Sequence, residues 1–433
     1  MQNVYSDESL KSHNPNSSVF NKACKKFGFD EPQQKALLEI FYLSRYFNRL
    51  KFLNDLKRSG VRNANIVFEK EYKNLHDAHA LQGDFKKFDA SFLNNVLFQD
   101  SDITEREILN LILYQAQNAF GRKVGEERNS IKAINFSRLD QLHYIDAARV
   151  LNLIERPRPF YSEYDEVWIA GASRYSMLLR VLDFEYIVRH FNIQINGQSY
   201  ILAGERQLSP NLDGVSPHLY QDIDNIRGKN LDEIDFKNYP KIVTQQSKDQ
   251  LIELAQRHNV KFNEDNPFIE NSKKFLFNYT QEKGPKLTET LAAKDILHQL
   301  DISGIDIVDT QADGHKRPDT ATTIKDAIYN FIGKICYGQF KDKKAFVILL
   351  QTNNPHVERQ TLVAQREVDN ALIDSKLIDE GYQVIIEGVG FSDNNRNINI
   401  INSELASLIA EKWRNISKGI DGKHLFYQTR SNI

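Results

Sequence analysis

Across roughly residues 160–400, short apolar or β-branched runs alternate with stretches of helical periodicity. These strand-like runs are Glu166–Ala170, Tyr200–Ala203, Ile305–Val308, Phe346–Leu350 and Tyr382–Ile386. Strands that alternate with helices along a chain form a parallel sheet covered by helices. The alternation therefore predicts an α/β domain with a parallel sheet.

Two of the intervening segments have the spacing of a helix with one apolar face. Apolar residues recur at i, i+3, i+4, i+7 and i+8 in one segment and at i, i+4 and i+8 in the other, namely Ile324, Ala327, Ile328, Phe331 and Ile332, and Ala292, Ile296 and Leu300. Each offers one apolar face to a sheet. We therefore expect a Rossmann-like parallel sheet with helices on both faces.

The first third of the chain has a different pattern. Residues 1–19 are polar and read as a disordered tail, and residues 20–155 show helical spacing, with a Thr-x-x-Glu capping box at Thr104 and Glu107. An Arg-Pro-Arg-Pro sequence then breaks any helix. We predict an all-helical domain over 20–155 and an α/β domain over 156–433.

Residues 205–286 interrupt the alternation inside the α/β domain. They are polar and contain several prolines, and about 80 residues is too long for a plain loop. We interpret this segment as an insertion that forms a lid, a small subdomain or a further βα unit.

Composition and charge narrow the partners. The formal net charge of −2 gives no basic field for nucleic acid or an anionic membrane. No apolar run approaches the ~20 residues that span a bilayer, and the N-terminus lacks a signal pattern. We expect a cytoplasmic protein, unless it is exported by a route that leaves no signal.

The two cysteines of the chain give no metal or disulfide signal. Cys24 and Cys336 alone cannot form a disulfide framework or a thiolate metal site, and we predict no metal ligands.

Ligands of open parallel sheets bind outside the carboxyl ends of the strands. The first strand is followed by the small residues Gly171, Ala172 and Ser173, and a helix begins near Ser173. Its free N–H groups and dipole favour an anion, which Arg174 or Arg180 would clamp. The alternative is a tight turn with a good helix cap.

Three further segments place polar residues near strand ends or helix starts. The second strand is followed by Gly204, Glu205 and Arg206, which we predict to contact the ligand. The alternative is that Glu205 and Arg206 form a solvated ion pair on the surface. Glu289 begins a helix, where a carboxylate is favourable in any case. Four hydroxyl or carboxylate side chains precede the Ile324 helix, more than one cap needs, and they include the candidates Asp319, Thr320 and Thr322.

The segment after the fourth strand is the most specific local signal. Thr352, Asn353 and Asn354 follow the apolar run directly, and His356 and Arg359 come next. An imidazole can transfer protons near neutral pH, and Arg359 can hold a carboxylate or phosphate. The alternative is a polar capping loop.

These pieces, in this order, resemble the YdcF/SanA/ElyC family of bacterial proteins over residues ~165–390, apart from the insertion. The matching elements are Ile169-Ala170-Gly171-Ala172 with Arg180, Ala203-Gly204-Glu205, Thr288-Glu289-Thr290, Gly304-Ile305, Asp319-Thr320, and Thr352 through Gln360 with its Thr, His and Arg. The second strand ends Gly-Glu where the family has Gly-Gly, and the family's Asn-Thr-x-Glu-Asn element loses both Asn and Glu. Residues 1–155 are unlike the family.

The resemblance implies a Rossmann-like fold and a site at these residues more than it implies a reaction. Some members of the family have been linked to S-adenosylmethionine, and others to envelope maintenance. The strict Gly-x-Gly-x-x-Gly and Gly-x-x-x-x-Gly-Lys-Ser/Thr motifs are absent, which argues against NAD and a P-loop.

Three functional hypotheses follow. The first is a binder or enzyme for a nucleotide-like or phosphorylated small molecule, with His356 as acid or base and Glu289 or Asp319 binding a hydroxyl, or Mg²⁺ if the substrate carries phosphates. The second is an S-adenosylmethionine-dependent methyltransferase, with Glu205 on a ribose hydroxyl. The third is a non-enzymatic interaction protein with a vestigial pocket, whose protein partner binds residues 20–155.

Overall fold

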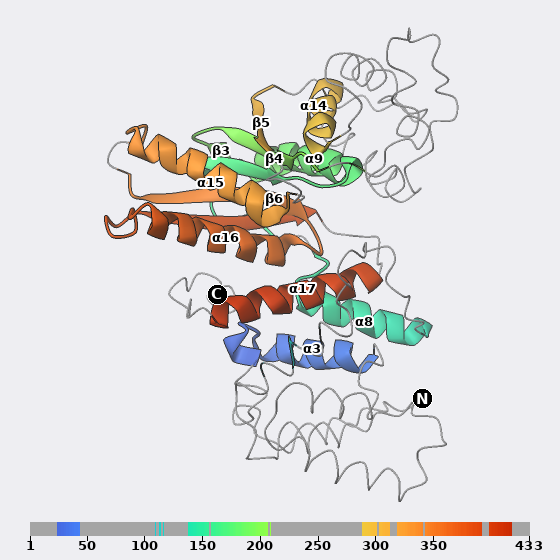
Figure 1. Ribbon diagram of the computed structural model, residues 1–433. Helices are drawn as coiled ribbons and strands as arrows, with labels where there is room; N and C mark the ends of the chain where they lie inside the picture. Colours follow the sequence, from blue (N-terminus) through green and yellow to red (C-terminus); the bar gives the residue numbers. More distant parts are fainter. Residues whose placement is uncertain are drawn as a thin grey trace, which may run out of the picture. The chain divides into compact units, whose positions relative to one another are not determined.

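The computed structural model divides the chain into two compact units (Figure 1). One consists of Met1–Ile154 with Arg396–Ile433, and the other of Glu155–Asn395. The structure describes residues 24–43, 137–155, 157–206, 288–300, 303–311, 318–340, 343–391 and 398–417, with single residues at 109, 112, 113, 116 and 208. The predicted capping box at Thr104 and Glu107, and the insertion beyond Leu208, lie outside these residues.

The second unit is built on a five-stranded parallel sheet. Its strands are β2 (Glu166–Ala170), β4 (Ser199–Gly204), β5 (Ile305–Thr310), β6 (Ala345–Asn353) and β7 (Gln383–Phe391). They lie in the order β5-β4-β2-β6-β7, and every neighbouring pair is parallel. The prediction of an α/β domain with a parallel sheet is confirmed.

Helices cover both faces of this sheet. They are α9 (Arg174–His190), α14 (Glu289–Leu300), α15 (Thr320–Cys336) and α16 (Val357–Asp374). Successive side chains of a strand point to opposite faces. Val167 and Ile169 accordingly pack in one core cluster with residues of α9 and α14, and Trp168 and Ala170 pack in a second cluster with residues of α15 and α16. Figure 1 shows α15 and α16 side by side on one face.

A buried carboxylate ties the start of this unit to its last strand. Glu387 of β7 accepts hydrogen bonds from the backbone N–H of Phe160 at 2.7 Å and from the hydroxyl of Tyr164 at 2.7 Å. Tyr164 belongs to β1 (Glu163–Tyr164), which pairs in parallel with β3 (Gln194–Ile195). Both strands have two residues, too few to produce a pattern in the sequence.

The first unit combines helices from both ends of the chain, namely α3 (Glu31–Leu43), α8 (Arg138–Val150) and α17 (Ile398–Ser417). The buried Tyr144 hydroxyl of α8 donates to Asn402 Oδ1 of α17 at 2.6 Å. This division differs from the predicted α/β domain over 156–433, because the last helix belongs to the unit that also contains α3 and α8.

The helices in the described part of the chain include none that is both long and apolar enough to cross a membrane.

Candidate functional site

The strand order places β2 and β6 at the point where the direction of winding reverses. Numbered along the chain, the strands lie in the order 3-2-1-4-5, as in doubly wound sheets that bind ligands between the first and fourth strands. The β2–β6 ladder ends at Ile169 and Gln351, while β6 remains paired with β7 as far as Asn353 and Phe391. The ends of β2 and β6 therefore separate here.

Arg180 connects the separated strand ends. Its side chain comes from α9 and is 2% exposed. Nη1 donates to the carbonyls of Ala170 at 2.6 Å and Gly171 at 2.8 Å, and Nε and Nη2 donate to Asn353 Oδ1 at 2.9 and 2.7 Å. We expected a clamp that touches the ligand; the structure instead buries the guanidinium among protein oxygens.

The turn after β2 leads directly into α9, which begins at Arg174. Ser173 is the N-cap of α9, but its hydroxyl donates to Ser176 Oγ at 3.1 Å and makes no capping hydrogen bond. Ala172, like its neighbours in the turn, is partly exposed. Arg174 opens the helix, and its side chain is outside the described part of the chain. The first N–H groups of α9 are therefore not capped by this serine.

Gly171 lies against the next strand and against Glu289. A Cβ at this position would come within 2.4 Å of the carbonyl oxygen of Leu202 and 3.2 Å of Glu289 Oε2. Because the nearer atom is backbone, only glycine fits the turn as it stands. The carboxylate of Glu289 is thus placed beside the turn after β2.

Glu289 forms an ion pair with Arg206 that the sequence did not predict. Arg206 Nε lies 2.5 Å from Glu289 Oε1, with side-chain exposures of 12% and 10%. The backbone N–H of Glu289 also donates to the carbonyl of Arg206 at 3.1 Å. The expected partner of Arg206 was its neighbour Glu205, which is exposed at the end of β4.

Asp309, near the end of β5, is a polar residue of this edge that sequence reasoning missed. Thr290 Oγ1 donates to Asp309 Oδ1 at 2.5 Å. The predicted strand ended at Val308, before Asp309 and Thr310. In the structure β5 continues to Thr310, whose carbonyl accepts the N–H of Glu205 at 2.9 Å.

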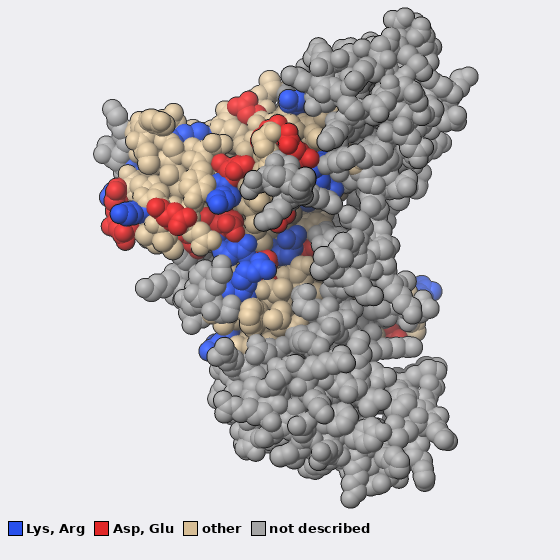
Figure 2. All heavy atoms as spheres, viewed as in Figure 1, with Lys and Arg blue, Asp and Glu red and all other residues tan. Residues whose placement is uncertain are grey.

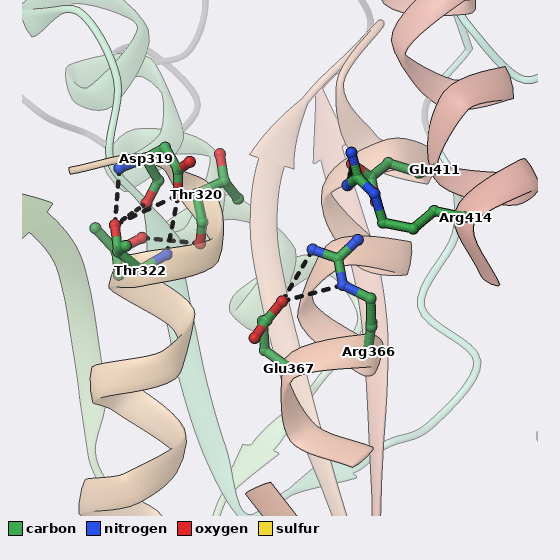
Figure 3. A network of polar contacts seen from close by, with 8 residues as sticks. Asp319, Thr320, Thr322, Arg366, Glu367, Glu411 and Arg414 are labelled. Atoms are coloured by element: carbon green, nitrogen blue, oxygen red, sulfur yellow. Dashed lines mark hydrogen bonds and ion pairs between the residues drawn. The ribbon is translucent and has the colours of Figure 1, made fainter. Parts of the chain in front are cut away.

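The Asp319 carboxylate and the hydroxyls of Thr322 and Thr323 make hydrogen bonds at the start of α15 (Figure 3). Asp319 is the N-cap, and its Oδ1 accepts the N–H of Thr322 at 3.0 Å while Thr322 Oγ1 accepts the N–H of Asp319 at 2.8 Å. The carbonyl of Thr320 accepts the hydroxyl of Thr323 at 3.2 Å. A reciprocal capping box therefore occupies two of the predicted ligand residues.

This helix start adjoins the end of β4. A Cβ on Gly204 would lie 2.8 Å from Pro318 Cβ, directly before Asp319. The edge near β4 and β5 thus gathers Gly204, Glu205 and the exposed Asp319.

Three residues that the sequence placed after the fourth strand belong to the interior, and two of them lie within β6. Thr352 is fully buried and donates its hydroxyl to Gln360 Oε1. The Asn353 side chain accepts hydrogen bonds from Arg180. Asn354 is also fully buried, and its side-chain amide donates a hydrogen bond to the carbonyl of Glu155. We predicted that these three side chains contact a ligand. In the structure they instead make hydrogen bonds within the protein that hold the loop in place.

His356 and Arg359 occupy the start of α16. The N–H of His356 donates to the carbonyl of Asn353 at 2.8 Å, and its own carbonyl accepts the N–H of Gln360 at 2.9 Å. His356 is the N-cap but makes no side-chain capping hydrogen bond. Both side chains are partly exposed. They are the predicted residues of this loop that reach the surface.

Charge gives no single-sign field on the visible face of the α/β unit, where acidic and basic side chains are intermixed (Figure 2). Across the residues that the structure describes, no group of three or more His, Cys, Asp or Glu side chains lies close enough to hold a metal ion.

The described site therefore has two linked parts. Arg180 joins the Gly171 turn to the loop that carries His356, and Glu289 with Arg206 lies against the same turn. The chain was compared with protein-family models, with curated proteins and with solved structures, and none of the three comparisons found a match. The likeness to the YdcF/SanA/ElyC family stays a prediction from the motifs.

Proposed function

We propose that the α/β unit binds a nucleotide-like or phosphorylated small molecule at the carboxyl ends of β2, β4 and β6. The observation that carries this proposal is the end of the β2–β6 ladder at Ile169 and Gln351, where the strand order reverses. Ligands of open α/β sheets occupy such points because the loops leave toward opposite faces and expose the strand ends.

The anionic group of the ligand is assigned to the turn after β2. The N–H groups of the first turn of α9 point along the helix axis, and the helix dipole favours negative charge there. The Arg180 guanidinium behind Gly171 adds a positive charge to this turn. Arg359, in the first turn of α16, is assigned to a second polar group of the ligand.

The hydroxyl-bearing part is assigned to the end of β4. Glu205 is exposed there, at the place where dinucleotide-binding sheets carry the acidic residue that binds a ribose hydroxyl. Glu289, which is ion-paired with Arg206, is a second hydrogen-bond acceptor and lies beside the turn after β2. S-adenosylmethionine also carries a ribose, so Glu205 equally favours the second candidate, an S-adenosylmethionine-dependent methyltransferase.

Any proton transfer is assigned to His356. It is partly exposed, and imidazole exchanges protons near neutral pH. Asp319 uses a carboxylate oxygen in the capping box, and Glu289 is ion-paired, so both are less suited to act as acid or base. Mg²⁺ enters this proposal only as a companion of ligand phosphates.

A thermal-shift screen of the full chain tests the proposal. The panel contains adenosine 5′-monophosphate, ATP, S-adenosylmethionine, sugar phosphates and inorganic phosphate, each with and without Mg²⁺. A ligand that binds only the folded state raises the melting temperature. We expect a shift with at least one phosphorylated compound, and its loss in Arg359→Ala and Glu205→Gln.

Matched controls separate the site from general effects. Arg189→Ala and His190→Ala remove an exposed arginine and an exposed histidine from the last turn of α9, at the opposite end of the helix from the site. They should keep the ligand shift, whereas Arg359→Ala and His356→Ala should lose or weaken it. No shift with any compound would contradict the proposal and favour a non-enzymatic interaction protein.

A further inference from the structure

We propose that Arg180 is a positioning residue that orients the two peptides of the Gly171 turn, so that the Ala172 N–H faces outward, and fixes the His356 loop relative to them. The inference rests on the proposed function, since these are the loops assigned to the ligand. It assigns to Arg180 no contact with the ligand, because the side chain is 2% exposed.

The orientation of the turn follows from peptide geometry. A trans peptide is planar, and its carbonyl and N–H point in opposite directions. Arg180 Nη1 holds the carbonyl of Ala170 at 2.6 Å and that of Gly171 at 2.8 Å. The N–H groups of the same two peptides, which belong to Gly171 and Ala172, must therefore point away from the guanidinium. In the β2–β4 ladder, in which Ala170 pairs with Leu202, the Gly171 N–H faces the carbonyl of Leu202. The Ala172 N–H is therefore the donor that an anion in front of the turn would meet.

The other edge of the guanidinium fixes the second loop. Nε and Nη2 both donate to Asn353 Oδ1, at 2.9 and 2.7 Å. The Asn353 amide donates to the carbonyl of Asn354 at 2.8 Å, and the Asn353 carbonyl accepts the N–H of His356 at 2.8 Å. The position of His356 therefore depends on Asn353, and that of Asn353 on Arg180.

The guanidinium connects β2 and β6 just beyond the last backbone pair between them. The last β2–β6 pair is Ile169 with Gln351, so the next residues of the two strands have no ladder between them. Arg180 links the two strand ends by side-chain hydrogen bonds instead. A planar fork can serve three oxygens at once, whereas a lysine ammonium is a point charge that cannot reproduce this geometry.

Backbone amide NMR of the full chain tests the coupling without any ligand. We expect Arg180→Lys to shift or broaden the amide signals of Gly171, Ala172 and His356 together. Arg189→Lys, an exposed residue of the same helix, should leave all three signals in place. A change confined to one of the two loops, or spread evenly along α9, would overturn the inference.

Asn353→Ala provides a second variant in case Arg180→Lys does not fold. It leaves both carbonyl bonds of Arg180 possible and removes the acceptor on β6, together with the amide bond from Asn353 to the Asn354 carbonyl. Asn353 is linked to the Gly171 turn through the Arg180 side chain. If Arg180 couples the two loops, the amide signal of Gly171 should therefore also shift in Asn353→Ala. An unchanged Gly171 signal would show that the two loops are independent and would overturn the inference.

Binding of adenosine 5′-monophosphate and inorganic phosphate separates this inference from the proposed function. Where the wild-type chain binds either probe, Arg180→Lys should weaken binding by about tenfold, as expected for misaligned charge-assisted donors. Equal binding by both chains would overturn the positioning role and leave the proposed function standing. No binding by the wild-type chain would contradict the proposed function alone, and the amide signals would still decide the coupling.

Discussion

Lys334 is the cation that accompanies the buried carboxylate of Glu166, at the amino end of β2. The side-chain exposures are 24% for Lys334 and 2% for Glu166, and the two groups are hydrogen-bonded. Trp168 Nε1 also donates to Glu166 at 2.9 Å, and Tyr200 lies 2.7 Å from the ammonium. Such a pair adds little to stability by itself, but removal of one partner leaves a buried charge without compensation.

Lys334→Met is therefore expected to destabilise the α/β unit by about 3 kcal/mol at neutral pH. Urea denaturation of the wild-type and variant chains measures this difference. Glu166→Gln in the Lys334→Met background is the control, because it removes the uncompensated charge and should recover part of the loss. A double variant that is no more stable than Lys334→Met would contradict this account.

The same pair gives a pH dependence with a definite sign. Burial raises the pKa of Glu166 above its ordinary range, although hydrogen bonds from Lys334 and Trp168 partly oppose this. The folded chain thus binds this proton more tightly than the unfolded chain, and the contribution to stability falls as pH rises through the raised pKa. Without Lys334 the pKa should rise further. The stability deficit of Lys334→Met should therefore shrink toward pH 4, where Glu166 is protonated in the folded state, and a deficit independent of pH would contradict the assignment.

Two glycine substitutions should change stability in opposite directions. Gly171→Ala would place a Cβ 2.4 Å from a backbone oxygen, so the turn must move, with an expected cost of about 1–3 kcal/mol. Gly333 lies within α15 and has no atom within 4 Å of an added Cβ, so Gly333→Ala should stabilise by about 0.5–1 kcal/mol. Thermal unfolding compares the two, and a neutral Gly171→Ala would mean that the turn is not constrained by close approach.

At the scale of elements, the apolar runs predicted the strands well and their carboxyl ends poorly. Glu166–Ala170 is β2 as predicted, because a central strand is buried along its whole length. Strand β6 continues three residues past the predicted Leu350, to Asn353. Polar residues there looked like a loop, but Thr352 and Asn353 have buried side-chain partners and keep the ladder with β7.

The grouping of the strand ends was predictable from the sequence, but their side-chain contacts were not. Parallel strands end at one edge of a sheet, and the five strands are parallel as expected. The partners Arg206–Glu289 and Thr290–Asp309 could not be foreseen, because they join segments brought together only by the fold. The excess of polar residues before α15 had a local explanation, a capping box that uses Asp319 and Thr322.

The contact between β7 and α16 supplies a prediction at this scale. A Cβ on Gly388 would lie 1.8 Å from Thr361 Oγ1, so the strand and the helix approach closely at this point. Gly388→Ala is expected to destabilise by about 1–3 kcal/mol through overpacking. Thr361→Ala in the same chain removes the clashing hydroxyl and should recover part of that stability, whereas strictly additive losses in a denaturation experiment would argue against this contact.

At the scale of the whole molecule, the two units differ in how the chain builds them. The α/β unit is one continuous segment, Glu155–Asn395, whereas the other unit joins the N-terminal part to residues 396–433. The Tyr144–Asn402 hydrogen bond is one of the links between these two segments. A continuous segment can form its core without residues from elsewhere, and a divided one cannot.

This difference leads to a prediction about fragments. Residues 155–395 expressed alone should unfold cooperatively, because the five strands and the helices on both faces all lie within them. A chain that ends at residue 395 should keep the α/β unit and lose stability in the helical one. Circular dichroism and limited proteolysis of both fragments would measure this. If residues 155–395 stayed unfolded while residues 155–433 folded, α17 would belong to the core of the α/β unit, and the division of the chain proposed here would be wrong.

Tyr144→Phe in the full chain is a milder variant that tests the same division. It should lower the stability of the helical unit by about 1 kcal/mol and leave the unfolding of the α/β unit unchanged.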